Sequence, residues 1–243
     1  MIREWLSSVL LPQLIVAPVL LPMLTAALML LMGEKRRGAK ALLNLLSSTL
    51  GLGVAVGLLL WVDGQAAPLA FGVYLPSNWP VPFGIVLVAD RLSALMLVLA
   101  AVTGLASLLF ALARWHRAGV HFHPLFQIQL MGLNGAFLTG DLFNLFVFFE
   151  VMLVASYGLL LHGSGRARVG AGLHYIAVNL LASSLFLIGA AMLYGVTGTL
   201  NMADMAHKLA LIPAADRGLL QAGAAILGLA FLIKAGLWPL NFW

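Results

Sequence analysis

Two charged residues stand inside long apolar stretches of this sequence, and both have side chains that bind or release a proton. Glu150 lies near the middle of segment 141–163, which is long enough to cross a bilayer as a single helix. Lys234 lies within a second apolar stretch, FLIKAGLWPL, at residues 231–240. A charge at the centre of a membrane helix costs roughly 2.5–3.5 kcal/mol on insertion scales, so such residues generally mark ion or proton pathways. The pair therefore predicts a proton relay inside a membrane.

The surroundings expected for Glu150 are aromatic and branched. Helical spacing places four such residues on its face: Phe143, Phe146, Val154 and Tyr157. Burial among them destabilises the charged carboxylate, whereas a nearby ammonium stabilises it, and this opposition suits a group that gains and loses a proton. The alternative is a permanent ion pair that joins two helices, although desolvation offsets most of the attraction in such a pair.

Lys234 is followed by two residues that interrupt helices. Pro239 cannot donate a backbone hydrogen bond to the carbonyl of Ala235, and Gly236 lies between them. The last helix is therefore expected to be interrupted beside Lys234, where freed carbonyls and a helix C-terminus would stabilise a cation in a water-lined cavity. The alternative is a lysine whose long side chain extends to the membrane surface.

Polar residues on the preceding helix are candidates for a supporting role. Tyr175, Asn179 and Ser183 recur every four residues and form a stripe that either holds water or joins two membrane helices. His174 is either a proton relay or an interfacial residue. These residues, with Gly236 and Pro239, complete the predicted site around Glu150 and Lys234.

The composition defines the class of protein that must position these residues. Hydrophobic residues make up 63% of the chain and charged residues only 9%, and the mean hydropathy is +1.06. This balance excludes an ordinary soluble domain. The chain has no cysteine, which excludes disulfides and thiolate metal sites, and its histidines lack metal-binding spacing. The sequence therefore predicts neither a metal site nor a cofactor.

The predicted fold is an all-α, polytopic transmembrane helical bundle that occupies residues 1–243 as one transmembrane domain. Segment 63–82 is rich in Gly and Pro and is expected to be a loop with a small hairpin. Segment 201–211 alternates apolar and polar residues at helical spacing and predicts a short amphipathic helix along the interface. About seven spanning helices are expected, at 10–32, 42–62, 83–113, 125–139, 141–162, 171–196 and 217–240.

The basic residues between the spans gather in alternate loops. The loops expected after the first, third and fifth spans carry Lys35, Arg36, Arg37, Lys40, Arg114, Arg117, Arg166 and Arg168. The positive-inside rule places these loops in the cytoplasm and the N terminus outside. The net charge of +5 is thus explained by orientation in a membrane, and no nucleic-acid partner is predicted.

Three segments of the sequence resemble a known family. TGDLFNLFVFFEVMLVASYGLLLHG (139–163) and KAGLWPLNFW (234–243) are similar to the antiporter-like subunits of respiratory complex I and of multisubunit Mrp-type cation/proton antiporters. Within that superfamily they most resemble the D subunit of the Mrp type. WPVPFGIVLVADRLSALMLV (79–98) resembles the entry of that subunit into its third helix. Asn241 stands where many complex I relatives carry histidine, which favours the Mrp type.

The resemblance implies a bundle of fourteen helices with two inverted repeats, each containing a broken helix. It also implies that Glu150 and Lys234 match the family's fifth-helix glutamate and seventh-helix lysine, which drive proton movement. Trp243 falls within a motif similar to the family's NFWLP. The chain is therefore expected to be a fragment, the N-terminal half, that lacks helices eight to fourteen.

The function implied by the resemblance is that of a transporter subunit rather than an enzyme. It would belong to a multisubunit Na+/H+ antiporter in the bacterial cell (inner) membrane, with the other Mrp subunits as partners and protons and Na+ as transported ions. One alternative is a proton-translocating membrane subunit of a complex I-like NADH:quinone oxidoreductase or of a membrane-bound hydrogenase. A second alternative is a non-catalytic assembly subunit.

Overall fold

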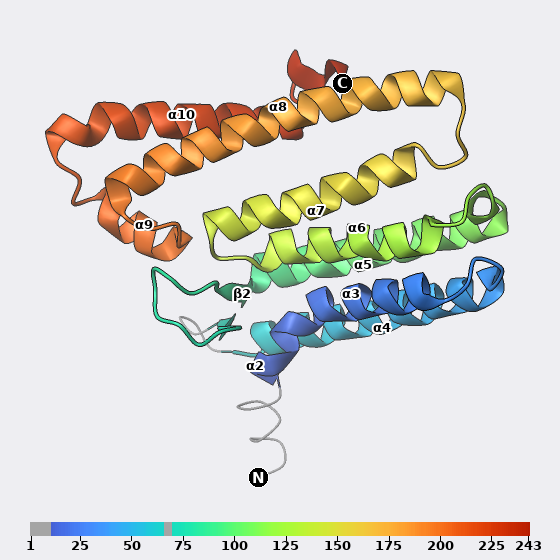
Figure 1. Cartoon of the computed structure of the whole chain (residues 1–243). Coiled ribbons are helices and arrows are strands. Elements are labelled where there is room, and N and C mark those ends of the chain that lie inside the picture. The colour runs from blue at the N-terminus through green and yellow to red at the C-terminus, as the bar shows by residue number, and fades with distance from the viewer. Residues whose placement is uncertain (1–10, 66–69) are drawn as a thin grey trace, which may run out of the picture.

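The computed structural model describes residues 11–65 and 70–243, and in it long helices lie side by side as a bundle (Figure 1). The helices of the bundle are α3 (Ala17–Leu31), α4 (Arg37–Asp63), α5 (Arg91–Ala113), α6 (Phe122–Leu138), α7 (Leu142–Leu160), α8 (Arg166–Thr197) and α10 (Arg217–Lys234). Six helical segments of the described residues are long and apolar enough to cross a membrane, and α6 is a shorter helix of 17 residues. The prediction of an all-α membrane bundle is confirmed.

The remaining elements are short. The first span begins with α2 (Leu11–Gln13) and η2 (Leu14–Val16), whereas Leu10, where the prediction began, lies outside the described residues. The expected interfacial helix is α9 (Met202–Leu209), which Asn201 caps by accepting hydrogen bonds from the amides of Ala203 and Asp204. Single turns of 3-10 helix occur at Trp115–Arg117, Ala214–Asp216 and Leu240–Phe242.

The third helix begins later than the predicted boundary at residue 83. Residues Leu87–Asp90 form strand β2, which pairs antiparallel with β1 (Phe71–Tyr74). Helix α5 starts only after Asp90, because the Asp90 carboxylate accepts the backbone N–H of Ser93 at 2.7 Å and caps the helix. The hairpin was expected within 63–82, but only its first strand lies in that segment.

Two helices extend further into the basic loops than predicted. Helix α4 begins at Arg37 instead of residue 42, and α8 begins at Arg166 instead of residue 171. Arginine and lysine are good helix formers, and the exposed Arg37 and Arg166 have long side chains that reach water from a helix end that leaves the apolar layer. The apolar run therefore marks the membrane-embedded part of each helix and not the whole helix.

The last helix ends at Lys234, six residues before the predicted boundary at 240. Gly236 adopts φ +63°, and its amide donates to the carbonyl of Ile233 at 3.0 Å while the amide of Leu237 donates to Leu232 at 3.1 Å. These are the two hydrogen bonds of a Schellman C-terminus, which glycine favours because it lacks a Cβ. Gly236, and not the later Pro239, therefore ends the helix.

Helices α8 and α10 approach each other closely at glycines. A Cβ added at Gly189 would lie 2.8 Å from the backbone nitrogen of Leu227 and 2.9 Å from the carbonyl oxygen of Gly223. Because both obstacles are backbone atoms, no side chain can turn aside to make room. Small residues at such crossings let membrane helices pack closely. The crossing fixes how α10, and Lys234 at its end, lies against α8.

One end of the bundle is joined by backbone hydrogen bonds. The amide of Gly140, between α6 and α7, donates to the carbonyl of Val86 at 2.8 Å. The amide of Leu142 donates to Leu200 at 2.8 Å, and the amide of Met202 donates to Gly140 at 2.9 Å. The connections that carry basic residues, α3–α4, α5–α6 and α7–α8, lie at the opposite end (Figure 1). At that opposite end a side chain joins two elements, because Arg37 of α4 donates to the backbone carbonyl of Arg117 at 3.2 Å.

Candidate proton-relay site

Three side chains from three helices meet inside the bundle. Glu150 comes from α7, Ser183 from α8, and Lys234 is the last residue of α10. The ammonium of Lys234 donates to the Ser183 hydroxyl oxygen at 3.1 Å, and this hydroxyl donates in turn to the Glu150 carboxylate. The Lys234 Nζ lies 3.9 Å from Glu150 Oε1. A hydroxyl group therefore bridges the acid and the base that sequence analysis singled out.

The environment of this group is largely apolar. The side chain of Lys234 is only 9% exposed and that of Glu150 is 28% exposed. The Lys234 ammonium lies 5.6 Å from the centroid of the Phe149 ring, a distance typical of a cation–π contact. Phe149 packs edge-on against Phe186 and Phe231, with ring centroids 6.2 Å apart in both pairs. These rings exclude water from one side of the ammonium.

A cavity of about 290 Å³ lies on another side of Lys234. It is lined by Phe149, Met152, Leu153, Tyr175, Asn179, Phe231, Lys234, Ala235 and Trp243. The Asn179 amide donates to the carbonyl of Tyr175 at 2.9 Å within α8, and the Tyr175 hydroxyl shares a hydrogen bond of 3.3 Å with Ser156. The polar stripe of the sequence is thus divided, because Ser183 contacts the charged pair whereas Tyr175 and Asn179 line the cavity.

The remaining residues of the predicted site are His174, Gly236 and Pro239. His174 is exposed and packs near Phe242, with ring centroids 5.9 Å apart, so the structure does not bring it to the charged pair. Gly236 terminates α10 directly after Lys234, whereas Pro239 lies in the segment beyond. The carbonyl of Ile233 accepts two donors, the amide of Gly236 at 3.0 Å and the Trp243 indole at 2.9 Å.

A second group of buried polar residues was missed by sequence analysis. It lies between α3, α4 and α6 and consists of Thr25, Asn44, Ser47, Ser48, His116, His123 and Gln127. Most of this group is uncharged, and an uncharged polar residue stands out less than an acid or a base inside an apolar span. The available signal was the amide side chains of Asn44 and Gln127 within largely apolar helices, since amides rarely face lipid.

The arrangement of Glu150, Ser183 and Lys234 allows a proton to move along it. A serine hydroxyl both donates and accepts a hydrogen bond, so it can pass a proton between a carboxyl group and an amine. Two unit charges at the separation of Glu150 and Lys234 attract each other by about 4 kcal/mol at an effective dielectric near 20. Neutralising either group therefore changes the free energy of the other charge by several kcal/mol.

Known proteins share this fold and the segments that carry the site. A protein-family model described as "NADH:quinone oxidoreductase/Mrp antiporter, TM" matches residues 139–243, which include Glu150, Ser183 and Lys234. The chain belongs to the family of antiporter-like membrane subunits that NADH:quinone oxidoreductase and Mrp antiporters share.

Within this family the chain is similar to D subunits of antiporters. It is 57% identical to the D subunit of a probable K(+)/H(+) antiporter of Rhizobium meliloti (strain 1021), over 99% of this chain and 44% of that protein. It is 40% identical to the D subunit of the Na(+)/H(+) antiporter of Alkalihalophilus pseudofirmus, over 95% of this chain and 46% of that protein. Its structure matches a chain of the Mrp complex from Dietzia sp. DQ12-45-1b with TM-score 0.81 and 36% identity, over 96% and 42% of the two chains. The chain spans about half the length of the curated relatives it matches.

Proposed function

We propose that this chain is part of a membrane subunit of a multisubunit monovalent cation/proton antiporter, and that Glu150, Ser183 and Lys234 move protons within it. The observation that carries the proposal is the hydroxyl bridge between a buried ammonium and a carboxylate at the junction of three apolar helices. The names of the similar proteins support transport rather than enzymatic catalysis. The partners would be the other subunits of such a complex in the bacterial cell membrane.

The proposed relay works in two steps that conserve protons. A proton first binds the Glu150 carboxylate and removes its charge, so the Lys234 ammonium loses its attraction and releases a proton into the cavity beside it. The neutral amine then takes the proton of Glu150 through the Ser183 hydroxyl, which restores the carboxylate and the ammonium. One proton enters at Glu150 and one leaves from Lys234 in each cycle.

The transported cation and the orientation are further parts of the proposal. We propose Na+ as the cation and a cytoplasmic position for the basic loops, with the N terminus outside. The names of the two similar subunits differ, since one names K+ and the other names Na+. The test must therefore compare both ions.

The experiment uses the full-length subunit with its partner subunits in inverted membrane vesicles from cells that lack other antiporters. A pH gradient is formed by respiration, and the dye-reported gradient is followed after addition of Na+ or of K+. We expect Na+ to dissipate the gradient. A response to K+ alone would reject Na+ as the cation, and no response to either ion would reject the antiporter function.

A redox-driven complex is the second candidate, because the matching family model also covers NADH:quinone oxidoreductase. In that case proton movement would require quinone or hydrogenase chemistry in neighbouring subunits and would not depend on an added cation. This candidate is excluded if added Na+ or K+ dissipates a pH gradient that is imposed by dilution of the vesicles, with no electron donor present.

Replacing Ser183 by alanine tests the hydroxyl bridge. We expect the Ser183→Ala variant to slow antiport by roughly 10-fold or more, because the alanine methyl group cannot pass a proton between Glu150 and Lys234. The matched control is Ser184→Ala, because the exposed Ser184 hydroxyl donates only to the carbonyl of Leu180 in its own helix at 3.0 Å. Equal rates for the two variants, at equal amounts of assembled complex, would show that Ser183 is not part of the path.

A further inference from the structure

A continuous set of buried hydrogen bonds runs between α3, α4 and α6, apart from the charged pair. Its members are each 8% exposed or less, and they are Thr25, Asn44, Ser47, Ser48, His116, His123 and Gln127. In a membrane protein, buried polar groups of this kind are costly and generally functional. The set begins at the basic end of the bundle, with His116 in the α5–α6 connection, and extends toward the middle of α3.

In the part of this set around Gln127, the donor and the acceptor of each hydrogen bond can be assigned. The Gln127 side-chain amide donates to the backbone carbonyl of Asn44 at 3.3 Å, which fixes its orientation, and the Ser47 hydroxyl donates to the side-chain oxygen of Gln127 at 3.3 Å. The Thr25 hydroxyl lies 2.9 Å from the Ser47 oxygen and 2.8 Å from the carbonyl oxygen of Leu21, so its one hydrogen is shared between them. The Gln127 amide donates to the side-chain oxygen of Asn44 at 2.7 Å, and the Ser48 hydroxyl donates to the same oxygen at 3.4 Å. The oxygen of Asn44 is therefore an acceptor, and its NH2 group must face the other way.

This direction fixes the protons of the two histidines. The Asn44 NH2 group lies 2.9 Å from His123 Nδ1, which must accept, and so the hydrogen of His123 is on Nε2. His123 Nε2 lies 3.2 Å from His116 Nδ1, which must accept in turn. Both rings are then neutral, and each hydrogen bond between Asn44 and His116 has one donor and one acceptor.

An additional proton cannot be added without breaking this order. A proton on His123 Nδ1 would face the NH2 group of Asn44, and a proton on His116 Nδ1 would face the N–H of His123. To avoid two donors that face each other, either the rings must separate or the Asn44 side-chain amide must rotate by half a turn. If Asn44 turns, Gln127 and Ser48 lose the oxygen to which they donate.

The charges around the pair keep it neutral at ordinary pH. In the part of the chain that the structure describes, the titratable groups acting on His116 and His123 from the neighbouring elements are all basic: Arg37 and Lys40 of α4, Arg117 beside His116, and His162 after α7. Burial lowers the pKa of His116, and Arg117, Arg37 and His162 lower it further. Proton uptake is therefore expected only as the pH falls below the ordinary histidine range.

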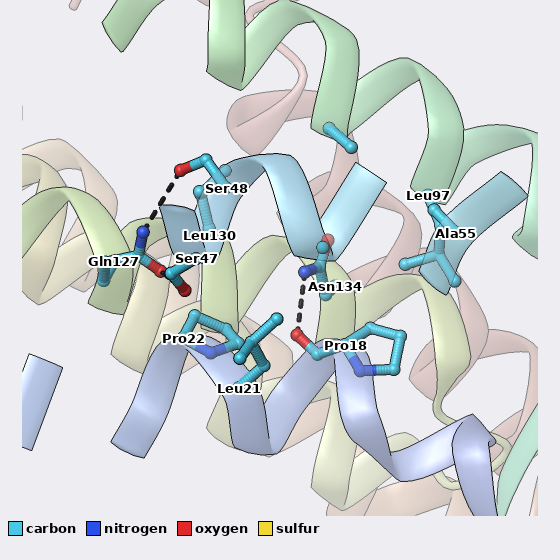
Figure 2. A pocket seen from close by; sticks show the side chains of 12 residues that line it. Pro18, Leu21, Pro22, Ser47, Ser48, Ala55, Leu97, Gln127, Leu130 and Asn134 are labelled. Carbon is cyan, nitrogen blue, oxygen red and sulfur yellow. Dashed lines mark hydrogen bonds between the residues drawn. The ribbon is translucent and has the colours of Figure 1, made fainter. Parts of the chain in front are cut away.

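A small cavity lies at the other end of the set (Figure 2). Its volume is about 30 Å³, enough for a water molecule where polar groups line the walls. Figure 2 shows Gln127 donating to Ser48 on one wall and Asn134 donating to the carbonyl of Pro18 on another. That carbonyl lacks a helical partner because Pro22 has no N–H. Gln127 and Ser48 thus belong both to the cavity wall and to the hydrogen bonds that a proton at the histidines would disturb.

We propose that His116 and His123 form a second proton-binding site, separate from Glu150 and Lys234, and that one proton bound there opens the cavity between α3, α4 and α6 to water by releasing Gln127 and Ser48. The site faces the basic end of the bundle. It shares no residue with the proposed relay, so either site can exist without the other.

The first test is nitrogen NMR of the histidine rings in the full-length wild-type subunit. Ring nitrogen shifts distinguish the two neutral tautomers from the doubly protonated ring, and His116→Gln and His123→Gln variants assign the signals. We expect both rings to carry hydrogen on Nε2 at pH 7.5, and the pair to take up one proton as the pH falls below the ordinary histidine range. Two rings that stay neutral down to pH 5, or that are charged at pH 7.5, would overturn the proposal.

The second test measures access to the cavity and uses the absence of cysteine in this chain. Ser48→Cys places a thiol on the cavity wall, and Ser164→Cys, in the exposed loop between α7 and α8, provides a reference that is accessible to water. Between pH 7.5 and pH 5.5 the pH stays below the ordinary pKa of a thiol. The thiolate fractions of both cysteines therefore change with pH in the same proportion, and this change cancels in the ratio of their labelling rates with a small thiol reagent. We expect this ratio to rise at least about threefold as the pH falls over that range.

Adding His123→Gln to Ser48→Cys removes one member of the pair. We expect the labelling ratio to become independent of pH in this double variant. A ratio that stays flat in the single variant while the histidines bind a proton would overturn the proposal, and so would a rise that persists in the double variant.

Discussion

Replacing Glu150 by alanine is expected to lower cation-driven proton movement by roughly 100-fold or more, the scale for removing a positioned proton-transfer group. The variant loses the group that accepts the entering proton, and it also leaves the buried Lys234 ammonium without its anionic partner, in contact with the Ser183 hydroxyl and the Phe149 ring. Removing one member of a buried ion pair destabilises a protein by about 3–5 kcal/mol. Loss of antiport in this variant alone therefore has two explanations, damaged folding or a broken relay.

The double variant Glu150→Ala/Lys234→Ala separates them. It leaves no unpaired charge at this site, and neutral replacement of a buried pair is often tolerated. We expect the double variant to assemble in wild-type amounts and still to lack antiport. Glu34→Ala, at an exposed acid in the basic loop after α3, is the control and should transport normally. If either Glu150 variant shows normal proton exchange in assembled complexes, the relay proposal is wrong.

Replacing Gly189 by valine is expected to disrupt the packing of α8 against α10. The new side chain would collide with the backbone of Leu227 and Gly223. Overpacking typically costs about 1–3 kcal/mol where side chains can shift, and backbone obstacles place this site at the upper end or beyond. We expect little assembled complex and a lowered melting temperature in detergent, measured by a thermal-shift assay.

Gly195→Val is the matched control for this prediction. Gly195 lies in the same helix, and nothing stands within 4 Å of a Cβ added there. This variant should assemble as the wild type does, because its side chain points into open space. Equal stability of the Gly189 and Gly195 variants would mean that the two helices are not held at the separation seen in the structure.

The sequence predicted the helices better than their ends. An apolar run of sufficient length must form a helix in a bilayer, because each backbone group needs a partner within its own segment. Where a helix starts and stops depends instead on single side chains. The Asp90 cap and the left-handed Gly236 moved two boundaries by several residues. Both signals are local and were present in the sequence, but they carry less weight than hydropathy when a whole span is assigned.

The charged pair was accessible to sequence analysis because an acid or base in an apolar run is conspicuous. The bridging role of Ser183 was not, since a serine on a helix also serves close packing. The histidine pair was missed for a different reason. His123 is 79 residues from its partner Asn44 along the chain, and Asn44 is 83 residues from Gln127. No periodicity within one helix reveals which neutral polar groups meet across three helices.

The backbone hydrogen bonds around Gly140 have a mechanical consequence. They join the backbone around Val86, Leu142 and Met202 to Gly140 and its neighbours. At the opposite end the contacts are made by side chains such as Arg37, which donates to the carbonyl of Arg117 at 3.2 Å. When the helices are joined by backbone hydrogen bonds at one end only, they are expected to move apart most at the other end. Deuterium uptake should therefore be slower at residues 140–142 than near residues 164–168.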